Sequence, residues 1–168
     1  MQDPHLGDDR LTLAGLFAES YKGIATALEH RLSDDSGLSL QWFELLIRLA
    51  RSPGHRLRMT DLANQTNLTP SGLTRAVDRL AEAGLVERVA CPSDRRVAYA
   101  ALTDAGLERI TAAVGPHLVH LDELFDVLSP AEREVFASLL RKVRDHVNPA
   151  AGVVTTPAPE SEPEPEPA

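Results

Sequence analysis

The spacing of apolar residues divides the chain into a series of helices and two short strands. Apolar residues recur every three or four positions along 10–32, 40–51, 60–66, 69–83, 103–128 and 130–147, which is the period of an amphipathic helix. The period becomes that of a strand at 85–89 and 97–102, and Pro92, Ser93 and Asp94 between these runs are turn residues. The segment 56–59 is too short to stand alone and is a candidate third strand. The pattern predicts a mostly α fold with a small β hairpin.

Local start and stop signals define two of these helices more closely. Thr60 and Thr69 are suited to cap helices, and Pro70 suits the first helical position, where its missing N–H costs nothing. Gly84 is well placed to end the second helix in the left-handed conformation. Two helices with only a few residues between them predict a helix-turn-helix.

Similar signals divide the flanking helices. The turn residues Ser33 to Gly37 are expected to end the first helix, and Ser39 is expected to cap the next one. Gly115-Pro116 is expected to kink or briefly break the long helix after the hairpin. Ser129 and Glu132 form a capping box at the start of the last helix.

The polar face of the second helix of the helix-turn-helix is informative about function. Opposite the apolar stripe of that helix are four polar side chains near its front: Ser71, Thr74, Arg75 and Asp78. In helix-turn-helix proteins the N-terminal residues of the second helix meet the base edges of DNA. We therefore predict DNA contact here, and the alternative is a merely solvated helix face. Asp78 either orients a neighbouring arginine or is a surface acid without a role.

The hairpin carries arginines just past its tip. Arg95 and Arg96 follow the turn, immediately after the helix-turn-helix, which is the layout of a winged helix. An arginine at a loop tip can enter a narrow minor groove. Arg88 and Arg95 are candidates for phosphate contact only. The alternative is a charged hairpin that touches no nucleic acid.

Three motifs in register resemble a known family. TDLANQTNLTPSGLTRAVDRLAEAGLVER, then SDRR, then LTDAG are similar to the winged-helix core of the MarR family of bacterial transcriptional regulators. The motifs themselves are Gly84-Leu85-Val86, Asp94-Arg95-Arg96 and Leu102-Thr103-Asp104-Ala105-Gly106. The strict resemblance covers roughly residues 38–108.

The resemblance implies a domain organisation and further residue roles. Residues 10–37 and 103–147 would be dimerisation helices around a winged helix-turn-helix lobe at 38–102. Arg96 would read the minor groove and Asp94 would hold the wing. A two-fold dimer would place two recognition helices roughly 34–36 Å apart, which matches a palindromic operator. The alternative to the dimer is a helical bundle within one chain.

Composition and charge agree with this interpretation once the charge is divided along the chain. The net charge is −8, but when the chain is divided into residues 1–55, 56–96 and 97–168, the middle part holds 7 basic and 5 acidic side chains and is the only one of the three that is net positive. The single cysteine excludes a disulfide within the chain, and we find neither a signal sequence nor a membrane span. We therefore expect a cytoplasmic protein, and its length predicts about one domain.

Both ends of the chain are expected to lie outside this domain. Residues 1–9 are expected to be mobile. Residues 148–168 are expected to form a disordered, acidic tail rich in Pro and Glu.

Two other groups of side chains suggest chemistry that we consider secondary. Cys91 could act as a thiol sensor, but the hydroperoxide sensors of the family carry their cysteine in the first helix, where this chain has none, so we interpret Cys91 as structural. His117 and His120 lie at helical spacing without a third metal ligand in register. We therefore expect neither a metal nor a cofactor.

Related regulators often bind small aromatic or phenolic molecules between the dimer helices and the winged lobe. Carried over by position, the residues that could line such a crevice are Phe17, Tyr21, Trp42 and Leu46. The alternative is that these side chains are ordinary core. Ligand binding would favour a spacing of the two lobes that does not fit DNA.

The leading hypothesis is thus a dimeric repressor of palindromic operators, relieved by a small ligand. The alternatives are a winged-helix protein-interaction module that no longer binds DNA, which the acidic tail favours, and a thiol-responsive regulator that uses Cys91. The sequence argues against an enzyme, because it contains no nucleophile–base pair, phosphate loop or complete metal set.

Overall fold

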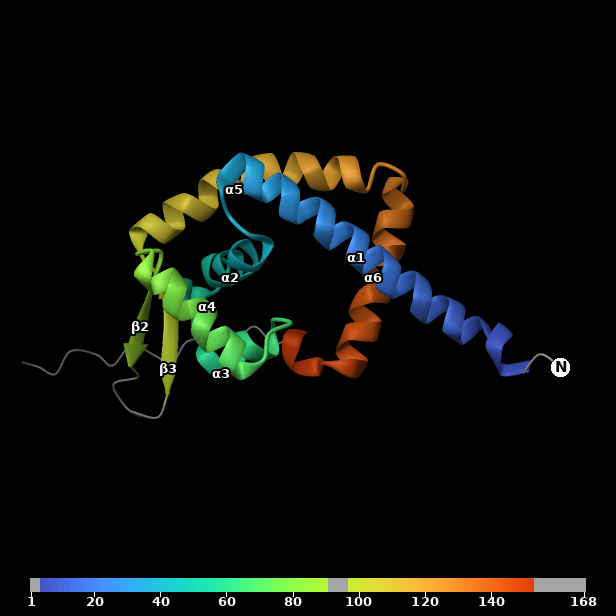
Figure 1. The fold of residues 1–168 in the computed structure, drawn as a ribbon, viewed down its shortest axis with the longest axis horizontal. Coiled ribbons are helices and arrows are strands. Elements are labelled where there is room, and N and C mark those ends of the chain that lie inside the picture. The colour runs from blue at the N-terminus through green and yellow to red at the C-terminus, as the bar shows by residue number, and fades with distance from the viewer. Residues whose placement is uncertain (1–3, 91–96, 153–168) are drawn as a thin grey trace, which may run out of the picture.

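The computed structural model describes residues 4–90 and 97–152, and within these it is mostly helical with a small sheet (Figure 1). The helices are α1 (Asp9–Ser36), α2 (Leu40–Ala50), α3 (Met59–Asn64), α4 (Pro70–Glu82), α5 (Asp104–Leu124) and α6 (Pro130–Val147). The strands are β1 (Arg56–Arg58), β2 (Val86–Ala90) and β3 (Ala98–Leu102). Short 3-10 turns lie at Pro4–Gly7, Pro53–His55 and Pro149–Gly152. The predicted fold class is confirmed. No helix of the described residues is long and apolar enough to cross a membrane.

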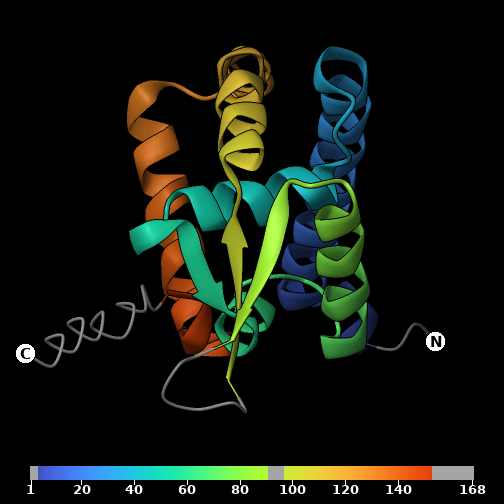
Figure 2. The ribbon, with the colours of Figure 1, turned by 90° about the vertical axis from the view of Figure 1, so that its left-hand side faces the viewer.

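The three strands form one antiparallel sheet in the order β1-β3-β2 (Figure 2). Arg58 is paired with Tyr99, and Val86 with Leu102, so β3 lies in the middle. The candidate third strand at 56–59 therefore does pair with the hairpin. Helix α4 lies beside β2 in Figure 2, while α6 lies on the opposite side of the lobe.

The sequence correctly predicted where α4 and α6 begin, because each of these helices starts with a side-chain cap. Thr69 accepts from the backbone N–H of Gly72, Pro70 is the first residue of α4, and Ser129 and Glu132 form the expected capping box. One cap was wrong: α3 begins at Met59, with Arg58 at the N-cap position and Thr60 already inside the helix. Because β1 runs directly into α3, pairing of the strand sets the start of this helix.

Two other boundaries differ from the sequence prediction. Helix α1 does not end near Leu32 but continues through the turn residues to Ser36 and stops at Gly37, whose φ of 62° is left-handed. Its last turn is held by α5, since Arg109 donates to the carbonyl of Ser36 and His120 contacts Asp35. Helix α5 runs unbroken past Pro116, although its ribbon bends, and ends at Leu124.

The motif that precedes α5 has a packing explanation. Thr103 accepts from the N–H of Gly106 at 3.0 Å and donates its own hydroxyl hydrogen to the carbonyl of Gly84 at 2.7 Å. A Cβ placed on Gly106 would lie 1.9 Å from the carbonyl oxygen of Leu85. Only glycine allows the start of α5 to approach the backbone between α4 and β2 this closely.

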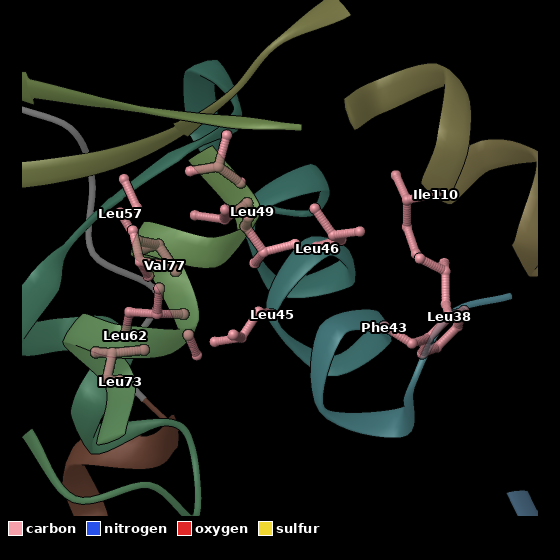
Figure 3. Packing of buried hydrophobic residues seen from close by; sticks show 14 of the residues in the cluster. Leu38, Phe43, Leu45, Leu46, Leu49, Leu57, Leu62, Leu73, Val77 and Ile110 are labelled. Atoms are coloured by element: carbon pink, nitrogen blue, oxygen red, sulfur yellow. The ribbon is translucent and has the colours of Figure 1, made fainter. Parts of the chain in front are cut away.

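The core is centred on α2, which is apolar on nearly all sides as predicted. Leu45, Leu46 and Leu49 are fully buried between α4, the sheet and α5 (Figure 3). This core fixes the orientation of α4 relative to β2.

Of the predicted mobile ends, residues 4–8 and 148–152 are described, and Pro149–Gly152 forms a turn rather than a structureless tail. The rest of the predicted tail lies outside the described residues.

Candidate nucleic-acid interface

Helix α4 buries one face and exposes the other. Its buried residues are Leu73, Ala76, Val77 and Leu80. The predicted contact residues Ser71, Thr74, Arg75 and Asp78 are all exposed. The apolar stripe of α4 therefore anchors the helix to the lobe and leaves its polar front available, as a recognition helix requires.

Two of these side chains bond to their own helix. The Thr74 hydroxyl donates to the carbonyl of Pro70 at 3.0 Å, and Nε of Arg75 donates to the carbonyl of Ser71 at 3.3 Å. The Arg75 bond uses Nε alone, so the paired NH groups at the end of the guanidinium can still bind an external acceptor. These contacts hold both side chains over the first turns of α4.

Asp78 forms an ion pair with Arg88 of β2. Their side-chain atoms are 2.8 Å apart, and Arg88 also donates to the carbonyl of Thr74 at 3.4 Å. Of the two roles considered for Asp78, the structure supports the one in which it orients an arginine. Arg88 consequently lies across α4, beside the predicted base-reading residues.

The wing itself is only partly described. Asp94, Arg95, Arg96 and Cys91 lie outside the described residues, so their predicted roles stay predictions. The paired ends of β2 and β3, Ala90 and Ala98, show where the hairpin loop begins.

Arg79 is a candidate contact that the sequence analysis missed. It is exposed and lines a shallow groove along α4 together with Gln41, Leu68, Gly72, Arg75, Asp78 and Glu82. Its position four residues after Arg75 places it on the same side of the helix, and this spacing could have identified it.

The four candidate effector residues do not share one crevice. Tyr21 lines a groove between α1, α2 and the α3–α4 turn, together with Glu29, Leu40, Gln41, Glu44, Leu45 and residues 66–68. Leu46 is instead fully buried, Trp42 packs against the core, and Phe17 is exposed on α1. In the single chain, Leu46 and Trp42 thus pack with the apolar neighbours that surround α2, as the core interpretation expects.

His117 and His120 do not converge on a common point. His117 is buried against the ring of Phe43, with the ring centroids 4.2 Å apart. Burial lowers its pKa, and the neighbouring His120 adds a smaller effect in the same direction. His120 instead contacts Asp35 and Arg31. Among residues 4–90 and 97–152, no group of His, Cys, Asp and Glu is arranged to hold a metal ion.

Comparison with known proteins agrees with this geometry. A family model described as MarR family matches residues 36–97. Sco3205, a MarR family transcriptional regulator of Streptomyces coelicolor crystallised in complex with DNA, is 32% identical, with a TM-score of 0.77 over 87% of this chain and 96% of that chain. AbsC from the same organism is 30% identical, with a TM-score of 0.75 over 83% and 95% of the two chains.

Another relative is also a transcriptional regulator by name. The transcriptional repressor YetL of Bacillus subtilis is 31% identical over 104 residues, or 62% of each chain. These relatives are transcriptional regulators and not enzymes. With its winged lobe, its exposed α4 front and these likenesses, the chain belongs to the MarR family and is a DNA-binding transcriptional regulator.

Proposed function

We propose that the protein is a dimeric, sequence-specific repressor of palindromic operators. The observation that carries this proposal is the front of α4, where Ser71, Thr74 and Arg75 are exposed while the opposite face is buried in the core. In this proposal α4 enters the major groove. The guanidinium of Arg75 can then donate two hydrogen bonds to one guanine, which is the commonest specific contact.

The remaining arginines would position the lobe on the duplex. Arg88, held beside α4 by Asp78, would contact a backbone phosphate, and Arg95 would do the same from the wing. Arg96 would enter the minor groove, with Asp94 holding the wing in place. Phosphate contacts fix the register, whereas α4 reads the sequence.

The dimer is supported by apolar surface that a single chain leaves uncovered. Helix α6 has no buried residue, yet its large apolar side chains recur at helical spacing: Val135, Phe136, Leu139, Leu140, Val143 and Val147. Helix α1 buries only Leu28 and Leu32, near its C-terminal end, and exposes Leu13, Leu16 and Phe17. Figure 1 shows α1 extending away from the winged lobe, whereas α6 runs from the end of α5 back toward α3. An exposed apolar surface of this extent is typical of an interface between subunits.

Two-fold packing of these helices would present two copies of α4 to one face of DNA. Recognition helices in such dimers read half-sites about 10 base pairs apart, so the operator would be palindromic. Repression, rather than activation, is supported by the repressor names of YetL and of MprA from Escherichia coli, a relative 27% identical over 107 residues.

The groove beside Tyr21 is the proposed effector site. It joins α1 and α2 to the turn before α4, so a molecule bound there touches the helices of both regions. Glu44 in this groove has a raised pKa because burial disfavours its charged form, although Arg48 partly offsets this. A neutral phenol could donate to the carboxylates of Glu29 or Glu44 and stack on Tyr21. Such binding would relieve repression by favouring a lobe spacing that does not fit DNA.

A duplex-binding titration at several salt concentrations tests the proposal. We expect selection from random duplexes to recover a palindrome, and affinity for it to fall steeply with salt because bound phosphates release counterions. Arg75→Ala should abolish the preference for that palindrome, whereas Arg141→Ala, at an exposed site on α6, should not. A salt-independent signal, or equal loss in both variants, would exclude the proposed role of α4.

A further inference from the structure

A second cationic surface lies beside the helix-turn-helix, away from the front of α4. Residues 48–58 carry four arginines and one histidine and no acidic residue. We call Arg48, Arg51, Arg56 and Arg58 the arginine patch. It runs from the last turn of α2 through Pro53–His55 and along β1, which leads directly into α3.

The side chains of the patch have different surroundings, and Nε of Arg58 donates to the hydroxyl of Tyr99 at 3.2 Å. The guanidinium groups of Arg56 and Arg58 lie 5.7 and 6.0 Å from the ring centroid of Tyr99. Burial lowers the pKa of Arg48, an effect that Glu44 opposes and Arg51 increases. The buried Nε atoms of Arg48 and Arg56 have no hydrogen-bond partner among the described residues. Arg51 is exposed, and its positive charge lies near that of Arg48. A patch of this kind attracts an extended anion.

The chain returns to this region after α6. The Asn148 side chain donates to the carbonyl of Asn64, the last residue of α3, at 3.1 Å. The turn Pro149–Gly152 packs against α3, and Figure 1 shows the end of α6 meeting that helix. Since α3 has 6 residues, it is only roughly 9 Å long. The last described residues therefore lie beside α3, the helix that directly follows β1.

The sequence beyond Gly152 is complementary to the patch. Residues 153–168 contain no basic side chain and four glutamates at alternate positions, Glu160, Glu162, Glu164 and Glu166. An extended proline-rich chain advances about 3.1 Å per residue, so Glu160 can lie up to roughly 25 Å from Gly152. This reach exceeds the summed lengths of α3 and β1, which together are roughly 19 Å. The prolines between the glutamates also reduce the entropy lost on binding.

We propose that residues 160–166 of each chain bind its own arginine patch when DNA is absent. Carboxylate–guanidinium pairs, which can be bidentate, would supply the contact. A regulatory consequence follows, and this part rests on the proposed function. The first helix of a helix-turn-helix crosses the DNA backbone, so arginines at the start of α3 are suited to phosphates. The acidic segment would compete for them and weaken binding to DNA of any sequence.

Docking is tested without DNA by paramagnetic relaxation in the full chain. A nitroxide attached at Ala168→Cys, in a Cys91→Ser background, should broaden the backbone amides of Arg51 and Arg58. The broadening should disappear when Glu160, Glu162, Glu164 and Glu166 are all changed to Gln, and in high salt. It should weaken with Arg51→Gln but not with Arg141→Gln. Broadening that is absent, or equally strong along α6, would overturn the proposal.

Competition is tested separately with a duplex of unrelated sequence. The four Glu→Gln changes should tighten binding roughly fivefold at low salt, the effect of one or two exposed ion pairs. Adding Arg51→Gln should remove this gain, whereas adding Arg141→Gln should preserve it. An equal gain in all backgrounds would show that the glutamates act only through net charge, and would overturn the competition. Failure of the palindrome selection described above would instead overturn the proposed function while leaving the docking result intact.

Discussion

Asp78 of α4 and Arg88 of β2 form an ion pair at 2.8 Å beside the proposed DNA-reading front. The pair joins two elements that are separated by the turn around Gly84. It places an acid among residues that would face phosphates, and it uses that acid to hold an arginine across the helix. Both side chains of the pair are exposed to solvent, so the pair contributes only about 0–1 kcal/mol to the free energy of unfolding. Its importance is therefore expected in DNA binding rather than in stability.

Asp78→Asn should loosen Arg88 and remove one negative charge from this surface. We expect tighter binding to unrelated duplexes and a smaller ratio of specific to non-specific affinity, because phosphate attraction rises while the position of Arg88 becomes less defined. Fluorescence anisotropy with operator and scrambled duplexes measures both. Glu134→Asn, at an exposed position on α6, is the control. An unchanged ratio would show that the ion pair does not position Arg88.

Gly106→Ala should destabilise the fold by about 3 kcal/mol, because its Cβ would lie 1.9 Å from the carbonyl oxygen of Leu85. Gly23→Ala in α1 is a matched control, since its Cβ would meet nothing within 4 Å. This change should stabilise by about 0.5–1 kcal/mol through the lower helix propensity of glycine. Urea denaturation measures both. Similar effects of the two changes would contradict the packing explanation of the motif.

Acid should destabilise the protein through His117. Burial lowers the folded-state pKa of His117 below its ordinary value of 6.5. The unfolded chain therefore takes up a proton first as the pH falls through 6.5, and stability is lost between that pH and the lower folded-state pKa. His117→Leu should lose less stability than the natural chain between pH 7 and 5, whereas His30→Gln, at an exposed site, should follow the natural chain. Thermal unfolding of the three proteins between pH 7 and 5 measures this loss of stability. If stability fell with pH in parallel for all three, the proposed role of His117 would be refuted.

Leu139→Glu should convert the proposed dimer to monomers. Leu139 is 56% exposed in the single chain, and each buried leucine contributes about 1.5–3 kcal/mol. Two copies of the change should raise the dimer dissociation constant at least about a hundredfold. Sedimentation velocity at micromolar concentration measures this. Ser138→Glu, one residue away and off the apolar stripe, should stay dimeric. If the natural chain is itself monomeric, the dimer proposal fails outright.

Elements with local signals could be predicted from the sequence. The start of α4 depends on Thr69 and Pro70, and the start of α6 on a capping box between Ser129 and Glu132. These bonds join residues three apart, so the local chain contains everything they need. The same holds for the orientation of α4, whose apolar stripe shows which side is exposed. For this reason the exposed positions of Ser71, Thr74 and Arg75 agree with the prediction.

Other features depend on contacts between distant segments. The last turn of α1 is helical because Arg109 and His120 of α5 hold it, although Ser33 to Ser36 are turn residues by type. Thr60 does not cap α3, because pairing of β1 with β3 extends the chain as far as Arg58. Likewise, the ion pair between Asp78 and Arg88 exists only because the sheet packs beside α4.

The sequence by itself determined the winged-helix class, the order of the helices and which face of α4 is free. Apolar periodicity and capping act over a single turn of chain, so one sequence contains the whole pattern. Tertiary structure alone decided that Leu46 is core rather than groove, that Asp78 pairs with Arg88, and that Asn148 brings the chain back to α3. These relations depend on how elements far apart in the chain pack together, which the spacing of residues within one element does not determine.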